Sequence, residues 1–462
     1  MENFWDSNVW GTYLIIGFLL ASLLVANILK RKIPFLRNSL IPNSVLGGIV
    51  ILIADAIYKL CSGGIGLFDA SIFGGKSYAV MEVLTYHCLA LGFIASSLKT
   101  SETKLTRERS VEIFNTGVTT VSSYLLQAVL GMGITMVAAI FLKNFFQAAG
   151  ILLPFGYGQG TGQAMNYGTI YETQHGFVGG KSFGLTIAAL GFLSASIGGV
   201  IHLNILRRKG IAGTKAQNTH NIERIEDENE IPMQESIDKL TIQVALIAVA
   251  YMLAYLLMYL LGLALPGMRS TIYGFNFLLG VLAATAVKAV MKLLKKTHLR
   301  TREYTNNFLL TRTSNFFFDL MVVAGIAAIR LDILGNYWGI MLVLGIVGMV
   351  ATYAYELWIA KTLFPKYEQE QFLMMYGMLT GTASTGTILL RELDPDFKTP
   401  AADNMVYQNF PAIVFGFPMM LLATLAPKQP MLTLIILIAF FLVMNIILFR
   451  AQIFKRKKTN AK

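Results

Sequence analysis

Long apolar runs recur along the chain, separated by short polar connectors. A helix needs roughly 20 residues to cross the hydrocarbon core of a bilayer, and eleven runs approach or exceed this length. They lie near residues 9–29, 43–60, 79–98, 113–142, 183–206, 240–263, 271–291, 314–334, 336–359, 403–425 and 430–450. The pattern predicts an all-α polytopic membrane protein.

The amino-acid composition agrees with this prediction. Of the 462 residues, 55% are apolar and only 14% are charged, whereas soluble domains have about 25% charged residues. The two cysteines, Cys61 and Cys88, both lie within apolar runs. These values exclude a soluble enzyme and a secreted protein built on a disulfide framework.

The distribution of basic residues predicts the orientation of the chain. A formal net charge of +12 would in a soluble protein point to nucleic acid, but here the Lys and Arg residues lie between apolar runs. Most of these 38 residues fall on connectors that follow odd-numbered runs, and cytoplasmic loops carry such an excess. We therefore predict an outside N-terminus, a cytoplasmic C-terminus and the lipid bilayer, not nucleic acid, as the partner.

The connector 207–239 is longer and more acidic than the others. It contains Glu223, Glu226, Asp227, Glu228 and Glu230 and few apolar residues, a composition typical of flexible segments. We predict a cytoplasmic linker between two halves of the chain, and a small regulatory helix is the alternative.

A repeated motif interrupts the apolar pattern once in each half. Residues 157–164 and 376–383 both fit Y-G-x-x-T-G-x-A, and each copy lies between the fourth and fifth runs of its half. Because five spans is an odd number, the second half enters the membrane inverted relative to the first, as in many secondary transporters. The predicted divisions are a first repeat at 1–206 with a re-entrant hairpin near 149–173, an inverted second repeat at 240–427 with a hairpin near 371–393, and an extra transmembrane helix with a basic tail at 428–462.

The motif copies are also the predicted binding site. Their glycines could serve only for close helix packing, but the density of hydroxyl and amide side chains favours a ligand site, because irregular backbone at membrane depth lines cavities and exposes helix ends to ions. The predicted substrate-binding residues are Gln159, Gly160, Thr161, Gly162 and Gln163 in the first copy, and Thr380, Gly381, Thr382, Ala383, Ser384 and Thr385 in the second.

Sodium, a hard cation, should favour oxygen ligands by analogy with other hard cations. The predicted sodium ligands are Thr161, Thr382, Asp319 and Ser96. Asp319 is chosen because it lies seven residues beyond Arg312, roughly 10 Å deeper along a helix, and charges within spans are often functional. An equal alternative is that Asp319 pairs with a polar group on a neighbouring helix.

Several segments together resemble one known family. Ile-Pro-Asn-Ser-Val-Leu-Gly-Gly at 41–48, Leu-Gly-Phe-Ile-Ala-Ser-Ser-Leu at 91–98, the Gly-rich hairpin at 156–164 and Ile197-Gly198-Gly199 are similar to bacterial glutamate:sodium symporters, in the same order over about residues 10–427. The first hairpin lacks the histidine usual in that family, the second also differs from the usual pattern, and the span at 430–450 extends past the usual end.

The resemblance implies a function and an assembly. It implies a sodium-coupled symporter that imports L-glutamate or a related small amino acid or carboxylate anion by elevator-like alternating access. It further implies a homodimer in the bacterial inner membrane, with sodium as the co-transported ion.

Two other classes stay open from the residues themselves. A passive channel or pore would also tolerate Gly and Thr in its hairpins. An intramembrane enzyme would need convergent carboxylates or a nucleophile and base, and Asp319 alone stands out as a deep carboxylate. The five histidines are scattered and no Walker A motif occurs, so we predict no enzymatic activity and no organic cofactor.

Overall fold

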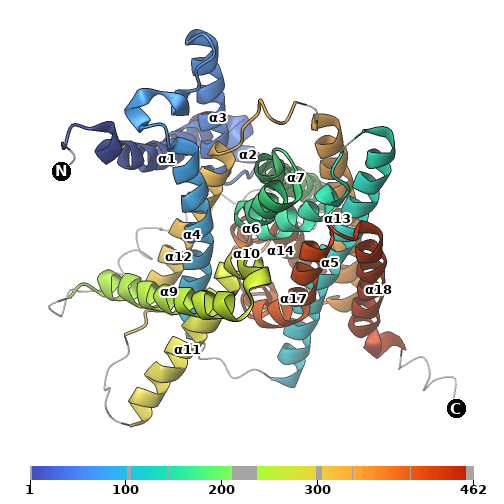
Figure 1. Cartoon of the computed structure of the whole chain (residues 1–462). Helices are drawn as coiled ribbons and strands as arrows, with labels where there is room; N and C mark the ends of the chain where they lie inside the picture. Colours follow the sequence, from blue (N-terminus) through green and yellow to red (C-terminus); the bar gives the residue numbers. More distant parts are fainter. Residues whose placement is uncertain are drawn as a thin grey trace, which may run out of the picture. The chain divides into compact units, whose positions relative to one another are not determined.

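The computed structural model describes residues 3–100, 106–143, 145–210, 237–297, 304–335, 337–395 and 397–453. Within these ranges every regular element is a helix, as Figure 1 shows. The prediction of an all-α chain is confirmed for this part of the protein. The acidic stretch 211–236 of the predicted linker and the basic tail from 454 onward lie outside the described residues.

Ten described helices are long and apolar enough to cross a membrane. They are α1 (Ser7–Lys32), α3 (Asn43–Cys61), α4 (Ser77–Leu98), α5 (Arg107–Phe141), α7 (Gly180–Arg208), α9 (Lys239–Ala264), α11 (Asn276–Lys296), α12 (Asn307–Ala327), α13 (Trp338–Leu363) and α18 (Pro430–Leu448). An eleventh span is reached if α16 (Ala401–Tyr407) and α17 (Asn409–Leu425), which meet at a bend of 52°, are taken together. The helices are those of a multi-pass membrane protein.

The helix ends differ from the predicted runs in three places. A short helix, α10 (Arg269–Gly274), precedes α11, so that the seventh span begins later than residue 271. The helix α12 begins and ends seven residues before the run 314–334. The run 403–425 is broken between α16 and α17. Hydropathy reports where apolar side chains lie, but helix ends depend on local backbone hydrogen bonds, which it does not record.

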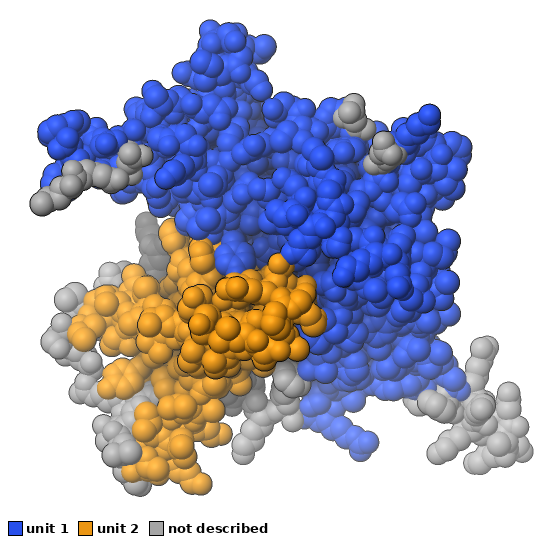
Figure 2. Space-filling view, in the orientation of Figure 1, with its two compact units in different colours: residues 1–86, 104–200, 320–462 blue, residues 87–103, 201–319 orange. Residues whose placement is uncertain are grey.

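The chain divides into two compact units, coloured separately in Figure 2. Unit 1 contains residues 1–86, 104–200 and 320–462, and unit 2 contains residues 87–103 and 201–319. Each unit therefore collects segments from both halves of the sequence, and three helices (α4, α7 and α12) contribute to both.

Unit 2 is held together by apolar packing between helices. Its core consists of Ile94, Ala95, Leu98, Ile247, Ala250, Ala284 and Leu310. The end of α4 meets α12 at Gly92, whose backbone carbonyl accepts a hydrogen bond of 2.9 Å from Ser314. A side chain at Gly92 would overlap the Phe318 ring, so this glycine permits the close contact.

Unit 1 is built around the long helix α5. This helix packs against α13, α17 and α18 and against four shorter elements: η3 (Gln147–Ile151), α6 (Leu152–His175), α14 (Glu368–Thr380) and α16. The helix α15 (Ala383–Arg391) packs along α14. Smaller elements of the unit are α2 (Pro34–Asn38), η1 (Leu67–Asp69) and η2 (Ser71–Phe73). The motif copies lie in α6 and at the break between α14 and α15.

Candidate functional site

The first motif copy lies in a helix that folds back on itself. Within α6, Gly160 has φ 76° and ψ −167°, a conformation that interrupts the helix and is essentially restricted to glycine. The rings of Phe155 and Tyr167 are stacked with centroids 4.1 Å apart. In a continuous helix these residues, twelve apart, would be separated by about 18 Å. The two arms of α6 therefore form a hairpin whose tip is Gly160.

The second motif copy forms another hairpin. The arms are α14 and α15, and the chain is non-helical at Gly381 and extended at Thr382 between them. A Cβ atom at Gly377 would lie 2.8 Å from the Cα atom of Gly386 on the opposite arm. The glycine pair thus lets the two arms pack in direct backbone contact, as the small-residue interpretation of this motif predicts.

The tips of the two hairpins lie next to each other in unit 1. A Cβ atom at Gly160 would lie 3.5 Å from the Cγ2 atom of Thr382. Thr161 is fully buried and donates a hydrogen bond of 3.3 Å to the carbonyl of Met321 on α12. A side chain at Gly325, one turn further along α12, would overlap Thr161. The predicted residues of both copies are therefore brought together.

The tyrosines that open the two motif copies bind the same residue. Tyr157 and Ser194 of α7 share a hydrogen bond of 2.9 Å between their hydroxyls. Tyr376 donates a hydrogen bond of 2.9 Å to the backbone carbonyl of Ser194. Tyr157 also donates to the carbonyl of Gly345 on α13 at 2.6 Å. One turn of α7 therefore anchors the first arms of both hairpins.

Buried polar atoms without partners gather at the first tip. Both amide atoms of Gln163, which is 1% exposed, and the Oε1 atom of Gln159 have no hydrogen-bond partner among the described residues. Leaving a buried polar group unpaired costs about 1–3 kcal/mol. Unpaired amide atoms next to a broken helix therefore favour a site at which a polar ligand supplies the missing hydrogen bonds.

The second tip carries hydroxyl groups and is more open. Thr380 and Thr385 are fully buried, Thr382 and Ser384 are partly exposed, and Ala383 is exposed. The hydroxyls of Thr382 and Thr385 lie 3.4 Å apart. The two tips thus offer amide groups on one side and hydroxyl groups on the other.

The predicted sodium ligands fall in different units. Thr161 and Thr382 belong to the hairpins of unit 1, whereas Ser96 on α4 and Asp319 on α12 belong to unit 2, and both are partly buried. No group of three or more His, Cys, Asp or Glu side chains suited to a metal occurs among the described residues. A cation at the hairpin tips would depend on neutral oxygens.

A row of polar side chains on α5 connects the second hairpin to the rest of unit 1. The row consists of Thr116, Thr120, Ser123 and Gln127, all at most 1% exposed. It faces α13, α14 and α16: Thr116 accepts a hydrogen bond from Gln371, Thr120 donates to Gln408, Ser123 bonds Glu356, and Gln127 donates to Thr352 and to the carbonyl of Leu379. We call these four residues the α5 polar row.

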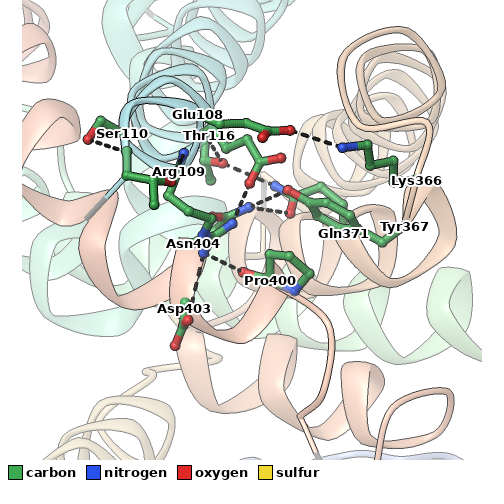
Figure 3. Close-up of polar contacts among 12 residues, drawn as sticks. Glu108, Arg109, Ser110, Thr116, Lys366, Tyr367, Gln371, Pro400, Asp403 and Asn404 are labelled. Atoms are coloured by element: carbon green, nitrogen blue, oxygen red, sulfur yellow. Dashed lines mark hydrogen bonds and ion pairs between the residues drawn. The ribbon is translucent and has the colours of Figure 1, made fainter. Parts of the chain in front are cut away.

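A second polar cluster lies where α14 begins, as Figure 3 shows. Asn404 of α16 donates to the hydroxyl of Tyr367 at 3.0 Å and to the amide oxygen of Gln371 at 3.1 Å. Burial is the main reason why the pKa of Tyr367 is raised to about 12, so its hydroxyl is neutral. Arg109 of α5 pairs with Glu112 and, at 3.7 Å, with Asp403. The cluster ties α16 and the start of α14 to α5.

An open pocket of about 590 Å³ adjoins this cluster. Its lining includes Arg107, Glu112, Asn115 and Tyr367. Lys366 and Glu108 form an ion pair of 2.9 Å at its edge, with both side chains more than two-thirds exposed. Such exposed pairs contribute little to stability. The pocket holds none of the predicted binding residues.

A carboxyl group buried inside a span is not among the residues predicted from the sequence. Glu356 is 1% exposed and lies in α13, within the predicted run 336–359. Asp319, the residue chosen instead, is only partly buried. The signal was present, because any Asp or Glu inside a span is a functional hypothesis by default.

Comparisons with protein-family models, with curated proteins and with solved structures returned no match to this chain.

Proposed function

We propose that the chain is a sodium-coupled secondary active transporter of a small amino-acid or carboxylate anion, with L-glutamate as the first substrate to test. The observation that carries the proposal is the meeting of two helical hairpins at Gly160 and Thr382, beside the unpartnered amide of Gln163. Broken helices with free ends are the usual binding elements of secondary transporters.

The proposed chemistry divides between the groups at the two tips. Broken helices present free N–H groups that favour an anion and free carbonyls that favour a cation. In this proposal the amide of Gln163 and the N–H groups after Gly160 and Thr382 bind the substrate carboxylate. The hydroxyl oxygens of Thr161 and Thr382, with neighbouring carbonyls, bind sodium.

We further propose the membrane arrangement that such a mechanism needs. The hairpins are re-entrant and belong to two inverted repeats, and elevator-like movement of the hairpin-bearing part alternates access between the two sides. The protein is a homodimer of the bacterial inner membrane, with the N-terminus outside. The equivalent positions of the two motif copies, each between the fourth and fifth apolar runs of a half with an odd number of runs, support this arrangement.

The test is uptake of labelled L-glutamate into proteoliposomes containing the full chain, with and without an inward sodium gradient. Unlabelled amino acids and dicarboxylates serve as competitors, and a compound that competes is then labelled in its turn. Saturable accumulation driven by the sodium gradient supports the proposal. Flux that neither saturates nor follows the gradient would indicate a channel and contradict it.

A pair of substitutions tests the hairpin site itself. Thr161→Val with Thr382→Val removes two hydroxyls while keeping side-chain volume, so we expect uptake to fall to background with normal expression. Thr424→Val is the matched control, because the Thr424 hydroxyl donates to the carbonyl of Leu421 in its own helix and to no other described residue. Near wild-type uptake by the double variant would show that these two hydroxyls are not ligands and would contradict the proposed site.

A further inference from the structure

Glu356 is a carboxyl group buried inside a candidate span, and the proposed substrate site does not use it. It lies seven residues before the end of α13 at Leu363, which places it roughly 10 Å along the helix from that end. Its side chain bonds the hydroxyl of Ser123 on α5. Among the described residues, Glu356 takes part in no ion pair.

The groups around Glu356 are neutral. Away from their ends, the helices packed against α13 carry tyrosines as titratable side chains: Tyr124 on α5, Tyr157 on α6 and Tyr376 on α14, besides Tyr353 and Tyr355 on α13 itself. On the α18 side, the Tyr355 hydroxyl donates a hydrogen bond of 2.8 Å to the amide oxygen of Asn445. Tyrosine hydroxyls are neutral at physiological pH, so none of these groups offsets a negative charge on Glu356.

Among the described residues, the charged groups on these helices lie nearer the helix ends, such as Glu368 and Glu370 in the first turn of α14. On α5, Arg109 and Glu112 are at least eleven residues from Ser123, about 16 Å along the helix. Arg450, which follows α18, lies over the ring of Phe114 and bonds Asn115. On α13, Lys361 is exposed. An ionised carboxylate buried without a cation is strongly disfavoured, so the carboxyl group of Glu356 carries a proton in this conformation.

The bonding around Glu356 reaches the second hairpin. Thr352, one turn before Glu356 on α13, accepts a hydrogen bond of 2.9 Å from the amide of Gln127. The same amide donates at 2.9 Å to the carbonyl of Leu379, the residue before the last of α14. A movement of the hairpin relative to α5 therefore breaks contacts one helical turn from the carboxyl group. This would change how much water reaches it.

We propose that Glu356 is a proton-binding site and that its proton is a second coupling ion of the transporter. The proton is taken from water when the hairpin is open to one side, forms an O–H bond with a Glu356 oxygen, and returns to water on the other side. No redox step or further reactant is involved. The coupling part of the proposal rests on the transport function proposed above, whereas the proton-binding part does not.

Proton binding is tested by infrared spectroscopy of the full chain in proteoliposomes near neutral pH. A neutral carboxylic acid has a carbonyl stretching band that ionised carboxylates lack. We expect this band in the wild type, its loss in Glu356→Gln and its retention in Glu356→Asp. Glu108→Gln is the control, because that carboxylate is exposed and paired with Lys366. A band of equal size in wild type and Glu356→Gln would overturn the proposal.

A second variant covers the case in which Glu356→Gln does not fold. Ser123→Ala removes the hydroxyl partner, so we expect the acid band to move to higher frequency, as it does when a carboxyl group loses a hydrogen bond. Size-exclusion profiles report the folding of each variant. A band that does not move in Ser123→Ala would mean that the acid observed is not Glu356.

Coupling is tested by uptake at fixed sodium with an inward proton gradient of about one pH unit. One coupled proton raises the accumulation ratio by up to roughly tenfold, and we expect Glu356→Gln to lose this increase and Glu108→Gln to keep it. A shifted sodium dependence with an unchanged proton response would identify Glu356 as a sodium ligand and overturn the proposal. An intact acid band without transport of any labelled compound would refute the transport function and leave the proton site standing.

Discussion

The two hairpins share a motif but break at different places in it. In the first copy the break is at Gly160, the fourth motif position, and in the second copy Leu379 occupies that position. Leucine cannot adopt the positive φ that Gly160 has, and the second break falls two residues later, at Gly381 and Thr382. The position of glycine within the motif therefore decides where the helix breaks and which side chains follow the break.

The hairpins also differ in what holds their arms. In α6 the arms are closed by aromatic stacking, and Tyr167 and Tyr171 donate to carbonyls of Met420 and Ala423 on α17. The second hairpin is held by the α5 polar row and has an exposed residue, Ala383, at its tip. We therefore expect the first hairpin to be rigid and the second to adapt when a ligand binds.

The largest expected effect comes from forcing a side chain into the first break. The Cβ atom added by Gly160→Ala would have no neighbouring atom nearer than 3.5 Å, so it causes no steric overlap. The cost of the substitution is instead the backbone strain of a positive φ at alanine, about 1–3 kcal/mol. Gly381→Ala has a negative φ, and its Cβ would lie 2.8 Å from the rotatable hydroxyl of Thr385 and 3.0 Å from the carbonyl oxygen of Gly377, so that its neighbours need to move by only a few tenths of an ångström. We expect Gly160→Ala to lower the melting temperature in detergent more and to abolish uptake. Equal losses in both variants would mean that the breaks are equivalent.

A smaller difference is expected between the two anchoring tyrosines. Tyr157→Phe removes contacts to Ser194 and Gly345, whereas Tyr376→Phe removes one contact, to the carbonyl of Ser194. At about 1 kcal/mol for a buried hydrogen bond, we expect losses of roughly 2 and 1 kcal/mol in the free energy of unfolding. Denaturant unfolding in detergent measures both. A larger loss for Tyr376→Phe would contradict the view of the first hairpin as the more firmly held.

Much of this arrangement could be predicted from the sequence because it depends on local pattern. Apolar runs located the long helices, and the repeated motif located both broken segments and most polar residues at their tips. The α5 polar row could not be predicted, because its partners, such as Glu356 for Ser123, are more than 200 residues away. Which polar side chains inside spans face one another is set by the packing of helices, and a single sequence does not record it.

The smallest difference is expected where each hairpin ends. In the last turn of α6, Glu172 accepts a hydrogen bond from the backbone N–H of Lys181 at 3.0 Å. After the second, Asp394 accepts three, from the backbone N–H groups of Lys398 and Thr399 and from the Thr399 hydroxyl, at 2.6–2.8 Å. Partial burial by itself would raise the pKa of Asp394. The hydrogen bonds from Thr399 and Lys398 outweigh it and hold this pKa below its ordinary value of 3.8.

The lowered pKa fixes the sign of the pH dependence. Because the folded protein binds the Asp394 proton less tightly than the unfolded chain, the carboxylate stabilises the fold above pH 3.8, and this stabilisation is lost as the pH falls through the lowered pKa. We expect Asp394→Asn to lower the melting temperature at neutral pH, by less than Tyr157→Phe. The difference from wild type should disappear in acid, and Glu172→Gln should have the smaller effect. If the melting temperature of Asp394→Asn stays below that of the wild type at acidic pH, the charge of the carboxylate does not stabilise this turn.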